Sequence, residues 1–121
     1  MGKYNEALKA TVAEQPDSKS ELVLANDVVI RLVAKPLRPV DLSNIKRNHP
    51  DFMTNPSLEG MVDLIIAKAR EEESDSLVFD ARDKPLLMRM DSTVITKAFG
   101  DLFGAQLEKA ADEEVSKKMG N

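Results

Sequence analysis

Apolar residues recur along the chain with more than one spacing, and each change of spacing marks a predicted element. In residues 3–14, KYNEALKATVAE, Tyr4, Leu8 and Val12 lie four residues apart, as on one face of a helix. Pro16 and the polar residues after it interrupt this pattern. We therefore expect residues 1–20 to form an amphipathic arm and a flexible linker. The arm can dock on a neighbouring subunit or remain a frayed helix without a partner, and the pattern leaves both open.

The following segment, ELVLANDVVIRLVAK, carries the clearest strand pattern. Two apolar runs, residues 22–24 and 28–33, lie on either side of Asn26 and Asp27. The second run is rich in β-branched residues, which favour strands, and Asn and Asp tolerate the backbone angles of tight turns. The pattern predicts an antiparallel hairpin, which must pack on helices because two strands alone are marginally stable.

A short helix is expected after the hairpin. Pro39 helps to end the strand, and Asp41 or Ser43 can cap the helix, with Leu42 and Ile45 as its buried positions.

Residues 55–73 contain the clearest helical pattern. Asn55 is in the position of an N-cap, Pro56 would be the first helical residue, and Gly60 suggests close helix packing. The acidic residues that follow are poorly placed at a helix C-terminus, so we expect the helix to end near Arg70 or Glu71. The predicted buried stripe consists of Leu58, Met61, Val62, Ile65, Ile66 and Ala69.

Two further helices are predicted between residues 80 and 104. Asp80 can cap a short helix over residues 85–90, and Asp91 or Ser92 can cap a second helix that ends or kinks at Gly104. One side of the second helix carries Val94, Ile95, Ala98, Phe99, Leu102 and Phe103. Beyond them, Leu107, Ala111 and Val115 form a stripe too narrow for a core helix.

These patterns together predict a mainly α (α+β) fold. A helical domain with a short antiparallel β-hairpin near its N-terminus occupies residues 21–104, between the arm of residues 1–20 and a charged helical tail of residues 105–121.

Composition supports one small domain with an aliphatic core. The chain has 121 residues, 42% of them hydrophobic, with four Phe, one Tyr and no Trp. The absence of Cys excludes disulfides and thiolate metal sites. A net charge of -4 argues against general nucleic-acid binding. We find neither a signal peptide at the N-terminus nor the run of about 20 apolar residues that a membrane helix needs.

The sequence offers little catalytic chemistry. His49 is the only histidine, lies beside Asp51, and is expected to be a surface-loop residue. The acidic runs do not match a calcium-binding loop, and no Gly-rich phosphate loop is present. Basic residues near the hairpin could form a small patch, although no aromatic residues are interspersed. We expect no enzymatic activity, no catalytic or metal-binding residues and no cofactor. The basic residues of the patch near the hairpin mentioned above are Arg31, Lys35, Arg38, Lys46 and Arg47.

The order of segments resembles the tail assembly chaperones of long-tailed, lambda-like bacteriophages. The resemblance covers residues 27–103: DVVIRLVAKPLRPVDLSNI, then the capped helix from Asn55, then SLVFDARDKPLLMRMDSTVITKAFGDLF. It consists of spacing and residue class and contains no signature residue. It implies a non-enzymatic protein of the host cytoplasm that binds the tape measure protein, helps recruit tail tube subunits, and is absent from the mature virion.

Partner-binding candidates follow from this resemblance and from the apolar stripes. They are Phe99, Leu102, Phe103 and Leu107, although core packing explains the first three equally well. Because the amphipathic ends have no obvious partner within the domain, we also expect a homo-oligomer, with no nucleic-acid or membrane partner. The alternatives are a small structural connector or a protein-binding adaptor module, and then a DNA-binding regulator.

The last residues, SKKMGN, have two interpretations. Gly120 suits a position just past a helix end, and Lys117 and Lys118 suit the negative end of the helix dipole. The resemblance implies instead that some ribosomes slip back one base near this point and make a longer product. Met-Gly-Asn can be encoded by the slippery sequence ATG GGA AAC, so the nucleotide sequence tests this hypothesis.

Overall fold

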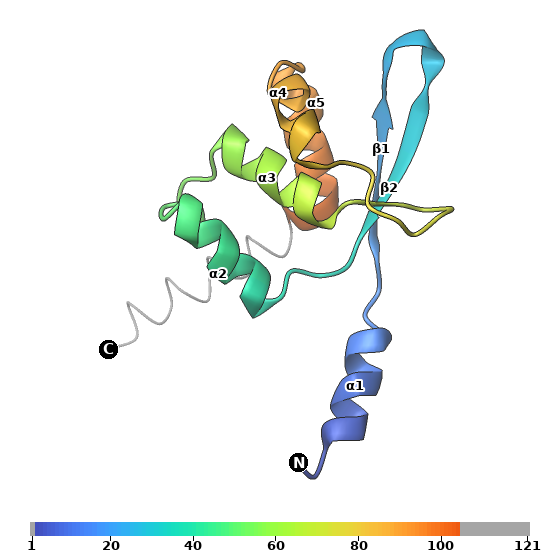
Figure 1. The fold of residues 1–121 in the computed structure, drawn as a ribbon, viewed down its shortest axis with the longest axis vertical. Helices are drawn as coiled ribbons and strands as arrows, with labels where there is room; N and C mark the ends of the chain where they lie inside the picture. The colour runs from blue at the N-terminus through green and yellow to red at the C-terminus, as the bar shows by residue number, and fades with distance from the viewer. Residues whose placement is uncertain (1, 105–121) are drawn as a thin grey trace.

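The computed structural model describes residues 2–104, which form a small α+β fold. Within this range it has five α-helices and a three-stranded antiparallel sheet (Figure 1). The α-helices are α1 (Asn5–Ala13), α2 (Pro39–Asn48), α3 (Leu58–Lys68), α4 (Lys84–Leu87) and α5 (Ser92–Phe99). The strands are β1 (Ser18–Val23), β2 (Val29–Ala34) and β3 (Arg70–Glu71). Shorter helical turns are η1 (Ala25–Asp27), η2 (Ala81–Asp83) and η3 (Gly100–Gly104). The predicted fold class is confirmed.

The predicted hairpin is present, and its turn is the predicted one. β1 pairs antiparallel with β2, from Ser18 opposite Ala34 to Val23 opposite Val29. Asn26 and Asp27 have φ values of 62° and 60°, the left-handed conformation that these residue types tolerate. β1 begins at Ser18, inside the segment that was predicted as linker.

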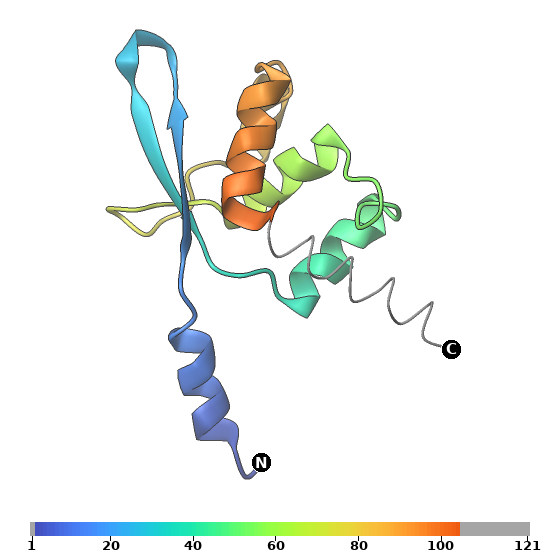
Figure 2. The ribbon, with the colours of Figure 1, turned by 180° about the vertical axis from the view of Figure 1, so that it is seen from behind.

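The sheet has a third strand that the sequence did not predict. β3 pairs antiparallel with the C-terminal end of β2, Arg70 opposite Val33 and Glu71 opposite Leu32, so the strand order is β1-β2-β3. The expectation of a helix reaching Arg70 or Glu71 is wrong, because α3 ends at Lys68 and the chain turns directly into this strand. The hairpin stands beside the helices and extends past β3 (Figures 1 and 2).

Two predicted helix starts are also wrong. α2 begins at Pro39 with Arg38 as its N-cap, and the Asp41 carboxylate instead accepts a hydrogen bond from the Arg38 backbone N–H at 2.9 Å. Proline fits the first helical position because its φ is already helical and its missing N–H is not needed there. α3 begins at Leu58 with Ser57 as its N-cap, not at Pro56 after Asn55.

Of the last two predicted caps, the one at Asp91 is confirmed. Asp80 caps the turn η2 and not the predicted helix over residues 85–90, because α4 has Asp83 at its N-cap position with no side-chain hydrogen bond. The Asp80 side chain accepts from the Arg82 N–H at 2.8 Å, and the Asp91 side chain accepts from the Thr93 N–H at 2.9 Å. The helix after Asp80 is shorter than predicted, because α4 ends at Leu87.

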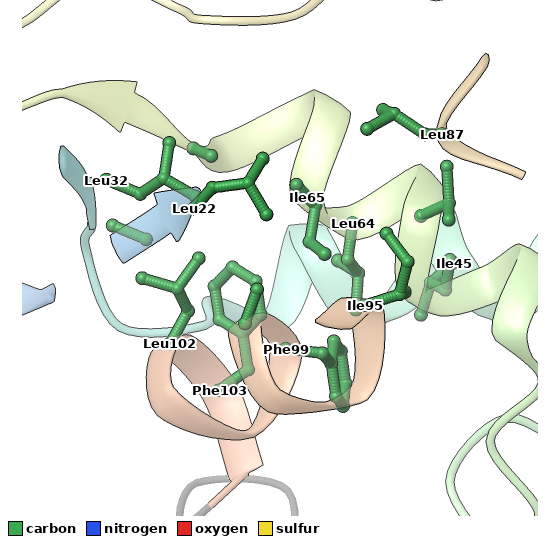
Figure 3. Packing of buried hydrophobic residues seen from close by; sticks show 14 of the residues in the cluster. Leu22, Leu32, Ile45, Leu64, Ile65, Leu87, Ile95, Phe99, Leu102 and Phe103 are labelled. Carbon is green, nitrogen blue, oxygen red and sulfur yellow. The ribbon is translucent and has the colours of Figure 1, made fainter. Parts of the chain in front are cut away.

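The core lies between the sheet and the helices, with α3 packed against α5 (Figure 3). Leu22 and Leu32 from the strands face Leu102 and Phe103 at the end of the α5–η3 segment. Leu64 is buried although it lies outside the predicted stripe, whereas Leu58 is exposed. The buried hydrophobic residues are Leu22, Leu32, Val33, Ala34, Ile45, Phe52, Val62, Leu64, Ile65, Ala69, Leu87, Ile95, Ala98, Phe99, Leu102 and Phe103.

Within residues 2–104, no helix has the length and apolarity needed to cross a membrane. The predicted tail and the SKKMGN segment lie outside the described residues.

Candidate partner-binding surface

The N-terminal arm presents an apolar stripe that no described residue covers. Tyr4 at the N-cap of α1, and Leu8 and Val12 within it, are 66%, 63% and 59% exposed. No residue of α1 is buried. Both views show this helix projecting from the rest of the domain (Figures 1 and 2). We call Tyr4, Leu8 and Val12 the arm surface.

The base of the arm is held to the domain by charged groups. The Asp17 carboxylate lies 3.0 Å from Arg70 and 3.4 Å from Lys35, and the Lys35 ammonium donates to the Gln15 carbonyl at 2.8 Å. These contacts attach the segment between α1 and β1 to β3 and to the residue that follows β2. The arm therefore leaves the domain from an anchored point.

A groove separates the end of the arm from the domain. It has a volume of about 430 Å³ and lies between Val12 on one side and Leu77, Ala67 and Lys68 on the other. Leu77 is exposed and adds one apolar side chain beside the arm surface. The rest of the groove lining is largely charged and includes Lys35, Arg38, Asp41 and Arg70. An apolar helix face beside an open groove is a geometry that can receive a helix from another protein.

The tip of the hairpin carries a second group of exposed apolar residues. Val23, Val28 and Val29 are all exposed, at the end of the sheet that is farthest from β3. Val28 and Val29 border an open hollow that also includes Glu21 and Arg31. Since charged residues interrupt this patch, the arm surface is the more continuous apolar feature.

The predicted partner-binding residues lie elsewhere. Phe99, Leu102 and Phe103 are 5%, 1% and 1% exposed and belong to the core (Figure 3). The Phe99 ring packs on Phe52 at a centroid distance of 5.8 Å and on Phe103 at 5.6 Å. Core packing, the alternative that the sequence left open, accounts for these three side chains in the folded domain. Leu107 lies outside the described residues.

The sequence did contain the signal for the arm surface. The four-residue spacing of Tyr4, Leu8 and Val12 was visible, but spacing alone does not tell an exposed stripe from a buried one. Two methionines also show that the sequence does not distinguish exposed positions from buried ones. Met61 is half-buried against the core, whereas Met88 is exposed.

His49 lies at the end of α2 beside an ion-pair cluster, which corrects its assignment to a surface loop. It is the C-cap residue of α2, its side chain is 15% exposed, and its Nε2 lies 2.8 Å from the Asp63 carboxylate on α3. The Lys84 ammonium lies 2.9 Å from both Asp63 and Glu59. Hydrogen bonds to Glu59 and then to Asp63 raise the pKa of Lys84 above its usual value. The cluster therefore ties α3 to the end of α2 and the start of α4.

The same cluster includes donor atoms that are close enough to share a cation. One atom from each of His49, Glu59 and Asp63 lies within 4.8 Å of the others. The Lys84 ammonium already neutralises both carboxylates, so a metal ion would have to displace it. The arrangement fits a structural ion-pair network better than a metal centre.

Several basic residues near the hairpin are paired with acids of the same domain. Lys35 pairs with Asp17, as described above, and Arg38 binds Asp41 at 3.1 Å. These carboxylates offset the charge of Lys35 and Arg38.

No protein family, curated protein or solved structure matches the chain.

Proposed function

We propose that this chain is a non-enzymatic tail assembly chaperone of a long-tailed bacteriophage. In this role it binds the tape measure protein in the cytoplasm of the bacterial host and helps bring tail tube subunits to it. It works as a homo-oligomer and is absent from the mature virion. The proposal starts from the resemblance of residues 27–103 to that family.

The observation that carries the proposal is the uncovered arm surface. Exposing three large apolar side chains on a short helix is unfavourable in water, so such a stripe suits a helix that is completed by a partner. A tape measure protein is long and helical, and an amphipathic helix recognises another helix by laying its apolar face against it. The acidic net charge of -4 helps to keep a complex with a hydrophobic client dissolved.

The alternatives differ from this proposal in what they bind and where they remain. A structural connector would be retained in mature particles at a fixed copy number. An adaptor module would bind one compact protein partner and no tape measure protein. A DNA-binding regulator would retard DNA in a gel, with affinity that falls as salt rises.

The experiment is co-expression of the tagged chain with the tape measure protein of the same phage. We expect the two to co-purify and the tape measure protein to remain soluble only when the chain is present. Leu8→Glu places a charge in the middle of the arm surface and should abolish co-purification. Because Leu8 is 63% exposed, this substitution should change the free energy of unfolding by less than about 0.5 kcal/mol.

The matched control is Ala10→Glu, which adds the same charge to the same helix. Ala10 lies two residues from Leu8 and Val12 and therefore faces away from the stripe. This variant should bind the tape measure protein as the unaltered chain does. Equal binding by all three chains would show that the arm surface does not recognise the client, and presence of the chain in purified virions would contradict the chaperone role.

A further inference from the structure

One edge of the sheet, the outer side of β1, has backbone groups directed away from β2. β1 is an edge strand, and its inner side pairs with β2. The Arg31 carbonyl on β2 accepts a hydrogen bond from the Glu72 N–H at 3.0 Å, so the backbone of Arg31 is directed toward β3. Glu21 lies opposite Arg31 in the β1–β2 ladder. In such a non-hydrogen-bonded pair the backbone of Glu21 points away from β2, to the outer edge.

The same alternation applies to Lys19, two residues earlier on β1. Within residues 2–104, no backbone group from outside the β1–β2 ladder bonds to the N–H or C=O of Lys19 or Glu21. The side chains of both residues are exposed and lie on one face of the strand. The edge therefore offers free donors and acceptors together with one positive and one negative side chain.

We propose that β1 pairs antiparallel with β1 of a second copy of this chain, with Lys19 opposite Glu21 of the partner copy. Twofold symmetry then also places Glu21 opposite the partner copy's Lys19. Both residues direct their backbone groups outward, so each opposed pair exchanges two hydrogen bonds. The sheets of the two copies become one continuous antiparallel sheet, and the unpaired edge is covered.

The charges of β1 select this register over its neighbours. A shift of the partner strand that keeps the outward groups opposed would place Lys19 opposite Lys19 or Glu21 opposite Glu21. Like charges directly opposite each other are destabilising, whereas opposite charges stabilise a cross-strand pair. A parallel arrangement in register also brings like charges together. Only the antiparallel pairing of Lys19 with Glu21 satisfies both residues.

Neighbouring charged groups are compatible with this pairing. Within one copy, Lys19 lies 3.0 Å from Glu72 and Glu21 lies 3.9 Å from Arg31, and these pairs are on the exposed face. They extend the alternation of charge across that face. On the other face, Ser20 donates to Asp101 at 2.8 Å. Lys97 lies 3.0 Å from that same Asp101 carboxylate, so these two charges offset each other.

This pairing would form the interface of the homo-oligomer in the proposed function, on which it rests. Self-association of the chain can nevertheless be measured without any client. Lys19→Glu and Glu21→Lys each convert two attractive cross-copy pairs into two repulsive ones. Each variant should associate about tenfold or more weakly than the unaltered chain in sedimentation equilibrium. The double variant Lys19→Glu/Glu21→Lys restores complementary pairs and should recover the association.

Mixing the two single variants supplies the sharpest test. A chain with Glu at positions 19 and 21 is complementary to a chain with Lys at both positions, so the mixture should form heterodimers that neither variant forms alone. Failure of the mixture to associate, or an unaltered chain that stays monomeric at high concentration, would overturn the pairing.

Two controls separate pairing from folding. Glu72→Gln removes the partner that Lys19 has within one copy and leaves the edge unchanged, so it should keep the association. Glu21→Pro removes an outward N–H that the β1–β2 ladder does not use, and it should prevent association. Its far-ultraviolet circular dichroism spectrum should remain that of the folded chain. Retained association of this variant would also overturn the pairing. A chain that dimerises in this way but captures no tape measure protein would contradict the proposed function alone.

Discussion

At the scale of single residues, Gly60 shows how one missing side chain fixes the packing of α3. A Cβ atom at this position would lie 2.6 Å from both Cδ2 and Cε2 of the Phe52 ring, far inside van der Waals contact. Phe52 is 1% exposed and packs edge-on against Phe99, at an interplanar angle of 88°. The ring therefore has no free space to move into. The sequence predicted close helix packing at Gly60, but the close neighbour is instead the Phe52 ring in the turn after α2.

Gly60→Ala should lower the free energy of unfolding by about 1–2 kcal/mol. Alanine favours a helix over glycine by about 1 kcal/mol, but overpacking a filled core typically costs about 1–3 kcal/mol. The second effect should be the larger one here because Phe52 is held by Phe99. Urea denaturation measures the difference. Gly100→Ala is the control, since nothing lies within 4 Å of its added Cβ, and it should be neutral or stabilising.

At the scale of elements, the start of α3 depends on a residue that the sequence did not single out. Ser57 is the N-cap, and its Oγ accepts a hydrogen bond from the Gly60 N–H at 3.0 Å. Ser57→Ala should destabilise the domain by about 1 kcal/mol. Asn55→Ala, at the position that the sequence favoured, should change stability by less than about 0.5 kcal/mol. Thermal or urea unfolding of the two variants distinguishes them, and equal effects would contradict the cap assignment.

The sequence predicted the type of each major element better than its limits. The hairpin, the helices and the cap at Asp91 followed from local chemistry, which a single sequence records. Near α3, Asn55, Pro56 and Ser57 all favour a helix start, and the structure places the N-cap at Ser57, where the side chain accepts from the Gly60 N–H. β3 was missed because it has only two residues, both charged, and it exists through pairing with Leu32 and Val33 more than thirty residues away.

The candidate site was predicted only in part, because the sequence shows a local pattern but not which elements cover it. The apolar stripe of the arm was visible, but its exposure depends on the absence of covering elements, which periodicity does not encode. The stripe of Phe99, Leu102 and Phe103 has the same kind of pattern, yet α3 and the sheet cover it. The outward edge of β1 could not be predicted, because it depends on which side of β2 is occupied by β3.

At the scale of the whole molecule, a buried ion-pair cluster joins α2 to α3 next to the sheet. The Asp41 carboxylate lies 2.7 Å from the Lys68 ammonium, and both side chains are about one tenth exposed, at 10% and 8%. Arg38 binds the same carboxylate through Nε and Nη2, each at 3.1 Å. Burial by itself would raise the pKa of Asp41, but the hydrogen bonds from Arg38 and Lys68 more than offset it and hold the pKa at about 2.

This cluster should make the stability of the whole domain depend on pH in acid. The pKa of Asp41 in the folded chain, about 2, is below its ordinary value of 3.8, so the unfolded chain takes up the proton first as pH falls. The stabilisation is therefore complete above about pH 5 and is lost between about pH 4 and pH 2. The pKa difference corresponds to roughly 2 kcal/mol. Asp41→Asn should remove this contribution to the slope of the free energy of unfolding against pH. The substitution should also lower that free energy by about 3 kcal/mol at neutral pH, because the buried Lys68 ammonium loses its carboxylate. Urea denaturation of both chains between pH 6 and pH 2 measures the two slopes, and equal slopes would show that Asp41 does not carry this dependence.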